Sequence, residues 1–251
     1  MRIQVLGCVR AWAGAEELDL GSAGQRAVLG LLALASGEAW SRRQLVDAIW
    51  GGRPPQTAVN VLQTRVKHLR RLLEPGRPRG GRGTVLRTVG DGYVLDLPSD
   101  AVDAGRFRTL IAGATAAHQR DEFVRSAMLL EQAVAAWHGP PVADIPELTE
   151  HPRVVGLLAA RRSAMARYGE VMVAIGSAAE ALPVLEEGVA AHPLDEVLHC
   201  WLLRAYQATG QRARASAAFR RICDRLADEL GLAPGRQLAE TYVSVLQDPA
   251  P

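Results

Sequence analysis

The sequence predicts a mainly α-helical protein with an α+β N-terminal part: a winged helix-turn-helix followed by an all-helical, tetratricopeptide-like domain. Residues 1–97 combine short strand-like runs with three helical patterns, whereas everything beyond them is helical in pattern. In the second half, small and apolar residues also recur at an interval of about 34. The Pro98-Ser99-Asp100 segment separates the two parts, so we expect domains at 1–97 and 98–251.

The first elements follow from apolar spacing. Ile3 and Val5 alternate with polar residues, as does the segment 17–20, and this alternation is typical of half-buried strands. A turn at residues 13–15 joins them, which predicts a small N-terminal sheet. Between Gln25 and Ala35 the apolar residues recur at intervals of three and four, which predicts one buried face of a helix.

Two more helices follow. Ser41 begins the second, because Gln44 completes a capping box three residues later. The glycines and prolines at 51–55 must interrupt this helix. A third helix runs from about Thr57 to Leu73 and ends before Pro75, because proline disfavours helical backbone in the preceding residue.

Two strand-like runs then occupy 85–89 and 93–97, and Asp91-Gly92 between them is a strong hairpin signal. The order of sheet, three helices and hairpin is that of a winged helix-turn-helix, whose third helix enters the major groove of DNA. The sequence therefore predicts a DNA-binding domain over residues 1–97.

The third helix has two different faces. Advancing 100° per residue gathers four apolar side chains into one stripe, which we expect to pack on the first two helices: Leu62, Val66, Leu69 and Leu73. The opposite face carries an amide, a hydroxyl and two cations, which suit base edges and phosphates: Asn60, Thr64, Lys67 and Arg71. Gln63 and Arg70 flank this face, and we predict that all six contact DNA.

Three further cations extend the predicted DNA contacts. Arg87 lies on the hairpin, and Arg42 and Arg43 lie at a helix N-terminus, where the helix dipole also attracts phosphate. Asp91 would be repelled by phosphates, so we expect the hairpin tip itself to stay clear of the DNA backbone. The Arg/Gly-rich loop at 77–83 is interpreted as a phosphate tether.

Charge is divided unevenly between the halves. Residues 1–97 hold 14 Arg and Lys against 8 Asp and Glu, a net charge of +6, while residues 98–251 hold 15 against 19, a net charge of −4. A concentrated positive region is typical of a protein that binds a polyanion. We therefore expect the first half to bind double-stranded DNA and the second half to meet protein.

The second half contains a repeat. An offset of about 34 aligns Gly176 with Gly210 and Ala181 with Ala215, and 34 is the period of tetratricopeptide repeats. An earlier unit that starts at Phe123 has similar internal spacing but is out of phase. Stacked helical pairs create a concave surface, which binds peptides, partner proteins or further copies of the same chain.

Other classes of protein are disfavoured by composition. No window approaches the ~18 consecutive apolar residues of a membrane span, and the N-terminus lacks the apolar run of a secretory signal, so we expect a cytoplasmic protein. The predicted DNA binding would associate it with the nucleoid. Cys8, Cys200 and Cys223 are widely separated and form no Cys-x-x-Cys motif, so we predict three core cysteines, no metal and no cofactor.

Two pairs of segments resemble a known family. LVDAIWGGRPPQTAVNVLQTRVKHLRRLLEP (45–75) and VLRTVGDGYVLDL (85–97) resemble the response-regulator-type winged helix of the actinomycete antibiotic regulatory proteins. AVAAWHGPPVADI (133–145) and the stretch 192–240 are similar to that family's bacterial transcriptional activator domain. The resemblance extends from about Ile3 to Leu246, and the pairing of both domains is more specific than either motif.

The resemblance implies a small-type, pathway-specific activator of antibiotic and other secondary-metabolite biosynthetic genes. Such a protein binds tandem direct repeats beside a promoter, self-associates on DNA and recruits RNA polymerase holoenzyme. The resemblance implies that the wing contacts the minor groove or the DNA backbone near Arg87. It implies base contact by four residues of the third helix: Asn60, Thr64, Lys67 and Arg71.

Two alternatives belong to different classes. The histidines form no His-x-x-x-His or His-Glu-x-x-His pair and no Gly-x-Ser-x-Gly elbow exists, so we expect no enzyme. The other alternative is a helical-repeat scaffold for protein interaction or ligand sensing, with a weak or vestigial DNA-binding domain. Trp137, Trp201 and Tyr206 could then line a pocket, although aromatic residues at helical spacing more often belong to the core.

Overall fold

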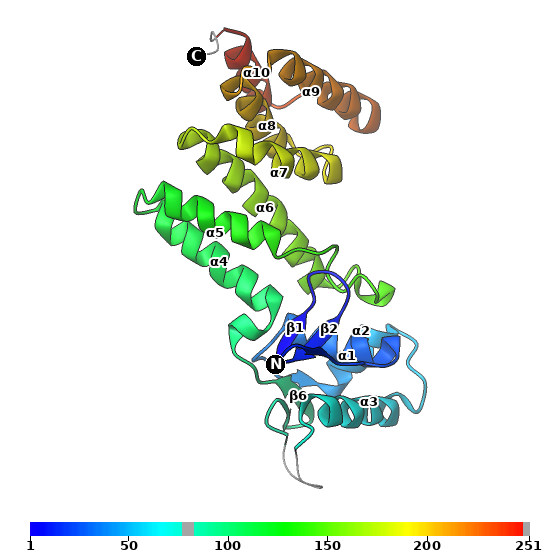
Figure 1. Ribbon diagram of the computed structural model, residues 1–251. Helices are drawn as coiled ribbons and strands as arrows, with labels where there is room; N and C mark the ends of the chain where they lie inside the picture. The colour runs from blue at the N-terminus through cyan, green and yellow to red at the C-terminus, as the bar shows by residue number, and fades with distance from the viewer. Residues whose placement is uncertain (77–82, 248–251) are drawn as a thin grey trace. The chain divides into compact units, whose positions relative to one another are not determined.

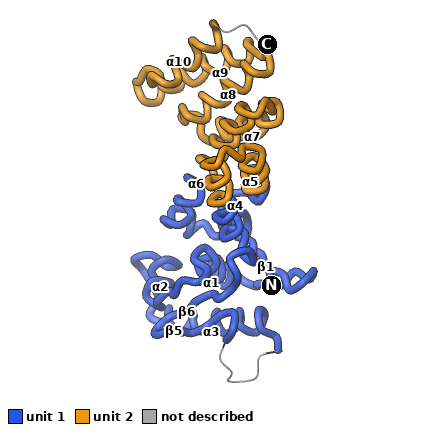
Figure 2. The backbone as a smooth tube through the Cα atoms, turned by 90° about the vertical axis from the view of Figure 1, so that its left-hand side faces the viewer, with its two compact units in different colours: residues 1–110, 135–159 blue, residues 111–134, 160–251 orange. Residues whose placement is uncertain are grey.

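The computed structural model describes residues 1–76 and 83–247 of the chain (Figure 1). The chain divides into two compact units (Figure 2). One unit comprises residues 1–110 and 135–159, and the other comprises 111–134 and 160–251. The unit with the winged helix therefore also contains residues beyond 97. The domain boundary at 97 and 98 itself stays a prediction.

The N-terminal sheet is confirmed. It is antiparallel with strand order β1-β2-β3, and its strands are β1 (Arg2–Gln4), β2 (Arg10–Ala13) and β3 (Glu16–Glu17). Gly14, with φ of +64°, makes the turn between β2 and β3. The run expected to continue to residue 20 ends at Glu17, because Asp19 accepts a hydrogen bond from the Gly21 N–H (2.9 Å) and turns the chain toward the first helix.

All three helices of the first unit's helix-turn-helix are confirmed: α1 (Ala23–Leu34), α2 (Arg42–Trp50) and α3 (Ala58–Leu73). The predicted capping box is present, because Ser41 Oγ accepts from the Gln44 N–H (3.2 Å) and Gln44 Oε1 accepts from the Ser41 N–H (2.9 Å). Gly51, with φ of +61°, ends α2 within the predicted break.

The wing is a second antiparallel sheet with order β4-β6-β5, made of β4 (Trp40–Ser41), β5 (Leu86–Val89) and β6 (Gly92–Leu95). The hairpin is confirmed, but its turn is Gly90-Asp91 and not Asp91-Gly92. Gly92 is the first residue of β6 and pairs with Val89. A Cβ on Gly92 would lie 1.9 Å from the Trp40 carbonyl oxygen, so glycine is needed here for the close approach of β4.

The first unit is completed by residues from beyond the wing. The Asp103 carboxylate accepts hydrogen bonds from the N–H groups of Val5 (2.8 Å) and Leu6 (2.9 Å). The carbonyl oxygens of the same two residues accept from the N–H groups of Val142 (2.9 Å) and His138 (2.8 Å). The backbone that follows β1 therefore depends on α4 (Asp103–His118) and on the segment after α5 (Phe123–Ala135).

The side chains of Trp137 and Cys200 lie in the core, as expected. Trp137 is 8% exposed and packs edge-on against Phe107, with ring centroids 5.2 Å apart. Cys200 is buried and Cys223 is half-buried, but Cys8 is exposed, so the expectation of three core cysteines was wrong. Cys8 lies in the loop between β1 and β2, where its side chain faces solvent.

The second unit is helical, and its repeat is confirmed. The residue after Gly176 and the residue after Gly210 make the same turn bond: the Ser177 N–H donates to the Met172 carbonyl (2.9 Å) and the Gln211 N–H to the Tyr206 carbonyl (2.7 Å). Both glycines have positive φ, +78° and +72°. The repeated pairs are formed by α6 (Pro152–Ala174), α7 (Ala178–Ala191), α8 (Glu196–Ala208) and α9 (Arg212–Arg225).

The earlier helical pair, α4 and α5, uses the same turn. Asp121 takes the left-handed position, with φ of +58°, and the Glu122 N–H donates to the Ala117 carbonyl (3.0 Å). The chain ends its described part with α10 (Arg236–Gln247), whose Tyr242 ring stacks on Phe219 at 3.9 Å. Among the described residues, no helix has both the length and the apolar character that crossing a bilayer requires.

Candidate nucleic-acid interface

Helix α3 is fixed by its buried face. It packs against α1 and α2 through four side chains that are 0–4% exposed: Leu62, Val66, Leu69 and Leu73. Burial of a leucine or valine side chain contributes about 1.5–3 kcal/mol each. The apolar stripe therefore sets how α3 is rotated about its axis, and with it which side chains reach solvent.

The opposite face of α3 is polar and exposed. Five predicted site residues lie on it: Asn60, Gln63, Thr64, Lys67 and Arg71. The Thr64 hydroxyl donates to the Asn60 carbonyl (3.0 Å), which leaves the hydroxyl oxygen able to accept a further hydrogen bond. Amide and hydroxyl groups can pair with base edges, and the two cations can pair with phosphates or guanine. We name these five residues the α3 polar face.

Arg70 does not belong to the α3 polar face. Its Nε donates to the Leu86 carbonyl (2.8 Å) and its Nη2 donates to the Thr88 hydroxyl (2.7 Å). Its guanidinium also lies 5.6 Å from the Tyr93 ring centroid. These contacts join α3 to the wing, so the structure gives Arg70 a positioning role, and its predicted DNA contact stays a prediction.

Glu74, which the sequence did not single out, fixes the other end of the same junction. It lies just beyond α3, and its Oε1 accepts hydrogen bonds from the N–H groups of Thr84 (2.7 Å) and Leu86 (3.1 Å). A lone acidic residue within a basic stretch was the available sequence signal. Arg70 and Glu74 together hold β5 at a defined position beside the C-terminal turn of α3.

The remaining predicted cations differ in exposure and in their ion pairs. Arg87 on β5 is exposed and forms an ion pair with Asp96. Arg43 is 90% exposed and lies 3.7 Å from Asp47, whereas Arg42 is half-buried and its Nε is enclosed. Of these three, Arg87 and Arg43 can therefore bind a phosphate, because each would give up only a weak surface ion pair with a carboxylate.

Arg65 has a structural role in the helix-turn-helix. Its guanidinium lies 4.7 Å from the Trp50 ring centroid and packs directly against Gly24, where an added Cβ would lie 2.2 Å from Arg65 Cζ. Burial lowers the pKa of Arg65. Arg65 thus joins α3 to both α1 and α2, and its half-buried guanidinium is less available to a phosphate than an exposed arginine of the same helix.

Arg53, which the predicted set of DNA contacts does not include, is exposed in the turn between α2 and α3. Its signal was a single cation among the glycines and prolines of that turn. The predicted phosphate tether at 77–83 lies, except for Gly83, outside the described residues. Within the described ranges, no group of three His, Cys, Asp or Glu side chains is placed to hold a metal ion.

An exposed polar face on the third helix, a wing fixed to the end of that helix and a following stack of helical pairs are the features of a DNA-binding regulator. Two family models match these parts: "Transcriptional regulatory protein, C terminal" over residues 16–95 and "Bacterial transcriptional activator domain" over residues 102–246. The chain belongs to the bacterial transcriptional activator domain family and, with both domains paired, to the antibiotic regulatory protein family of transcriptional activators.

Several relatives resemble the chain along most of its length. It is 34% identical to the regulatory protein AfsR of Streptomyces coelicolor over 100% of this chain and 25% of AfsR, so it spans a quarter of that protein. It is 32% identical to the transcriptional regulator RedD of Streptomyces coelicolor, over 89% of this chain and 64% of RedD. The regulatory protein DnrI of Streptomyces peucetius is 28% identical, over 98% of this chain and 92% of DnrI.

A solved structure has the same fold. Mycobacterium tuberculosis EmbR, in complex with a low affinity phosphopeptide, matches with a TM-score of 0.87 and 28% sequence identity, over 100% of this chain and 66% of the EmbR chain. The agreement extends over both units. The pairing of winged helix and helical repeats is therefore common to this chain and EmbR.

Proposed function

We propose that the protein is a sequence-specific DNA-binding activator of antibiotic biosynthetic genes, which works at the chromosome in the cytoplasm. It binds tandem direct repeats near a promoter and recruits RNA polymerase holoenzyme. The observation that carries this proposal is the α3 polar face, an exposed set of hydrogen-bonding and cationic side chains opposite a fully buried stripe. Family membership supports the regulatory role.

The residues divide into two kinds of contact. Asn60, Gln63 and Thr64 carry no charge, so they suit base edges, where an amide pairs well with adenine. Lys67 and Arg71 suit phosphates or guanine, and Arg87 on the wing suits the backbone of the same duplex. Arg70 holds the wing beside α3, so the two parts of the interface act as one surface.

The direct test replaces the two cations of the α3 polar face in the full chain. Each lost contact costs about 1–3 kcal/mol, so Lys67→Ala combined with Arg71→Ala weakens operator binding at least tenfold and flattens its salt dependence. The control is Arg120→Ala combined with Arg236→Ala, which removes the same charge from exposed positions on the helical domain. Unchanged affinity and salt slope in the first variant would remove this face from the interface.

Tandem binding has its own geometric test. Copies that touch each other on direct repeats must lie on one side of the duplex, so half-site centres lie about 10–10.5 bp apart or at a multiple of that distance. Insertion of half a helical turn between the half-sites should abolish cooperative binding. Cooperativity that survives this insertion would contradict contact between neighbouring copies.

Recruitment of polymerase is assigned to the helical domain. Residues 98–251 carry a net charge of −4, which disfavours contact with DNA and leaves their surface available to protein. A contact worth about 1.4 kcal/mol raises promoter occupancy by polymerase tenfold. In a purified transcription system, the full chain at saturating operator occupancy should stimulate a weak promoter, and an unchanged transcript level would contradict recruitment.

A further inference from the structure

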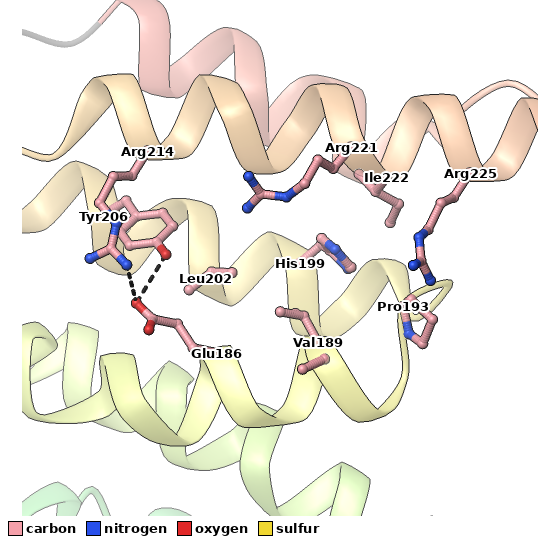
Figure 3. A pocket seen from close by; sticks show the side chains of 11 residues that line it. Glu186, Val189, Pro193, His199, Leu202, Tyr206, Arg214, Arg221, Ile222 and Arg225 are labelled. Atoms are coloured by element: carbon pink, nitrogen blue, oxygen red, sulfur yellow. Dashed lines mark hydrogen bonds and ion pairs between the residues drawn. The ribbon is translucent and has the colours of Figure 1, made fainter.

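Helices α7, α8 and α9 line a concave pocket of about 320 Å³ within the second unit (Figure 3). All of its lining residues belong to that unit, so it is separate from the α3 polar face. Small-molecule sites typically range from about 300 to 1,000 Å³. The pocket is therefore large enough for one small ligand, and DNA binding gives it no role.

Part of the pocket wall is apolar. Val189 comes from α7, Leu202 from α8 and Ile222 from α9, and the side chains of Leu202 and Ile222 are 1% and 0% exposed. Figure 3 shows these three side chains around the middle of the pocket. Of the three, only Val189 is partly exposed, so an apolar ligand would bury its own apolar surface and that of Val189 here, which favours binding.

The charged lining is positive. Three arginines of α9 and one glutamate of α7 line the pocket, which leaves a net charge of +2. Glu186 accepts hydrogen bonds from the Tyr206 hydroxyl (3.0 Å) and from Arg214 Nη2 (2.9 Å), so its charge is neutralised by Arg214. Within residues 1–76 and 83–247, the one ion-pair partner of Arg225 is Glu229, at 3.9 Å. Among the described residues, Arg221 forms no ion pair or hydrogen bond.

A buried histidine adds a polar atom inside the pocket. His199 is 6% exposed, and its Nδ1–H donates to the Asp195 carbonyl (2.9 Å). This is the one hydrogen bond of its side chain among the described residues, and Figure 3 shows the ring between Val189 and Arg221. Burial lowers the pKa of His199, and this effect outweighs the hydrogen bond to the Asp195 carbonyl and the charges of Asp195 and Glu196, which raise it. In the neutral form of the ring, with the proton on Nδ1, Nε2 can accept a hydrogen bond from a ligand.

We propose that this pocket binds a small organic acid. Its carboxylate pairs with Arg221, and its apolar body packs against the half-buried Val189, with Leu202 and Ile222 behind it. Arginine suits a carboxylate because its planar N–H groups match both carboxylate oxygens. Because residues of three successive helices line the pocket, a bound ligand would stabilise the packing of these helices, and metabolite concentration would then change the stability of the activator domain.

The test measures binding of defined probes to the full chain by isothermal titration calorimetry. The probes are aromatic and aliphatic monocarboxylates, each with its neutral amide as partner. An acid should bind about tenfold or more tightly than its amide, because charge-assisted hydrogen bonds are about twice as strong as neutral ones. Arg221→Met should weaken acid binding by a similar factor. The control is Arg220→Met, which removes an adjacent exposed arginine that does not line the pocket.

Three results would overturn the proposal: no acid of the panel binds, acids and amides bind equally, or Arg221→Met keeps the affinity of wild type. A glutamate-rich peptide is titrated in parallel, and Arg221-dependent binding of that peptide without any binding of the acids would also overturn it. Operator DNA binding by Arg221→Met should equal that of wild type. This comparison separates failure of the pocket from failure of the proposed DNA-binding function and confirms that the variant folds.

Discussion

Replacement of Asp103 by alanine tests whether the winged-helix unit depends on residues beyond the wing. The Asp103 carboxylate accepts from the N–H groups of Val5, Leu6 and Ala104, at 2.8–2.9 Å. A hydrogen bond contributes about 1 kcal/mol net, so loss of all three in Asp103→Ala should lower the free energy of unfolding by about 3 kcal/mol. For comparison, whole domains are stable by only about 5–15 kcal/mol.

The assay is amide hydrogen exchange in the full chain, read at Val5 and Leu6. Loss of about 2 kcal/mol of local hydrogen bonding at these two amides should lower their protection about thirtyfold. Asp100→Ala is the matched control, because Asp100 is an exposed acidic residue three positions earlier. If protection at Val5 and Leu6 is the same in Asp103→Ala as in wild type, the anchoring role of Asp103 is refuted. A fragment that ends at residue 97 lacks this acceptor altogether, so the intact chain is the proper test protein.

Two further predictions concern the wing and the helical domain. Gly92→Ala should destabilise the wing by about 3 kcal/mol and weaken operator binding, because the added Cβ would overlap the backbone of β4. The control is Gly52→Ala, which should be neutral because the space around Gly52 is open. Equal urea unfolding midpoints for the two variants would contradict this prediction. The pKa of His199 lies below its ordinary value of 6.5, so the folded state binds fewer protons than the unfolded state, and the free energy of unfolding should fall as pH falls through and below 6.5. His199→Gln should reduce that slope in urea unfolding, and an unchanged slope would contradict the assignment.

Helix and strand positions could be predicted from patterns of neighbouring residues. The features that the sequence did not predict depend on contacts between residues far apart in the chain. The capping box at Ser41 and the two faces of α3 depend only on nearby residues, so both could be predicted. The hairpin turn was predicted one residue too late. Gly92 is required by the close approach of β4, and it does not form part of the turn. Asp103 is 98 residues from Val5 in sequence, and no local pattern links them.

The same reasoning applies to the candidate site. Helical spacing places Arg65 and Arg70 beside the polar residues of α3, and only the packing partners distinguish them. Arg65 meets Trp50 and Arg70 meets the wing, so both stabilise the fold instead of projecting from the α3 polar face. Basic residues at the border of an apolar stripe are the ones for which sequence alone cannot separate structure from binding.

The most direct test of sequence reading by α3 is a binding selection from randomised operator DNA with wild type, Asn60→Ala and Thr64→Ala. A residue that pairs with a base edge should, when removed, relax preference at one base-pair position by about 1–3 kcal/mol and leave the other positions unchanged. Thr109→Ala, on α4, provides a hydroxyl-removing control. Position-specific loss of preference in the α3 variants alone is the predicted result. Identical base preferences in all four proteins would contradict base reading by Asn60 and Thr64.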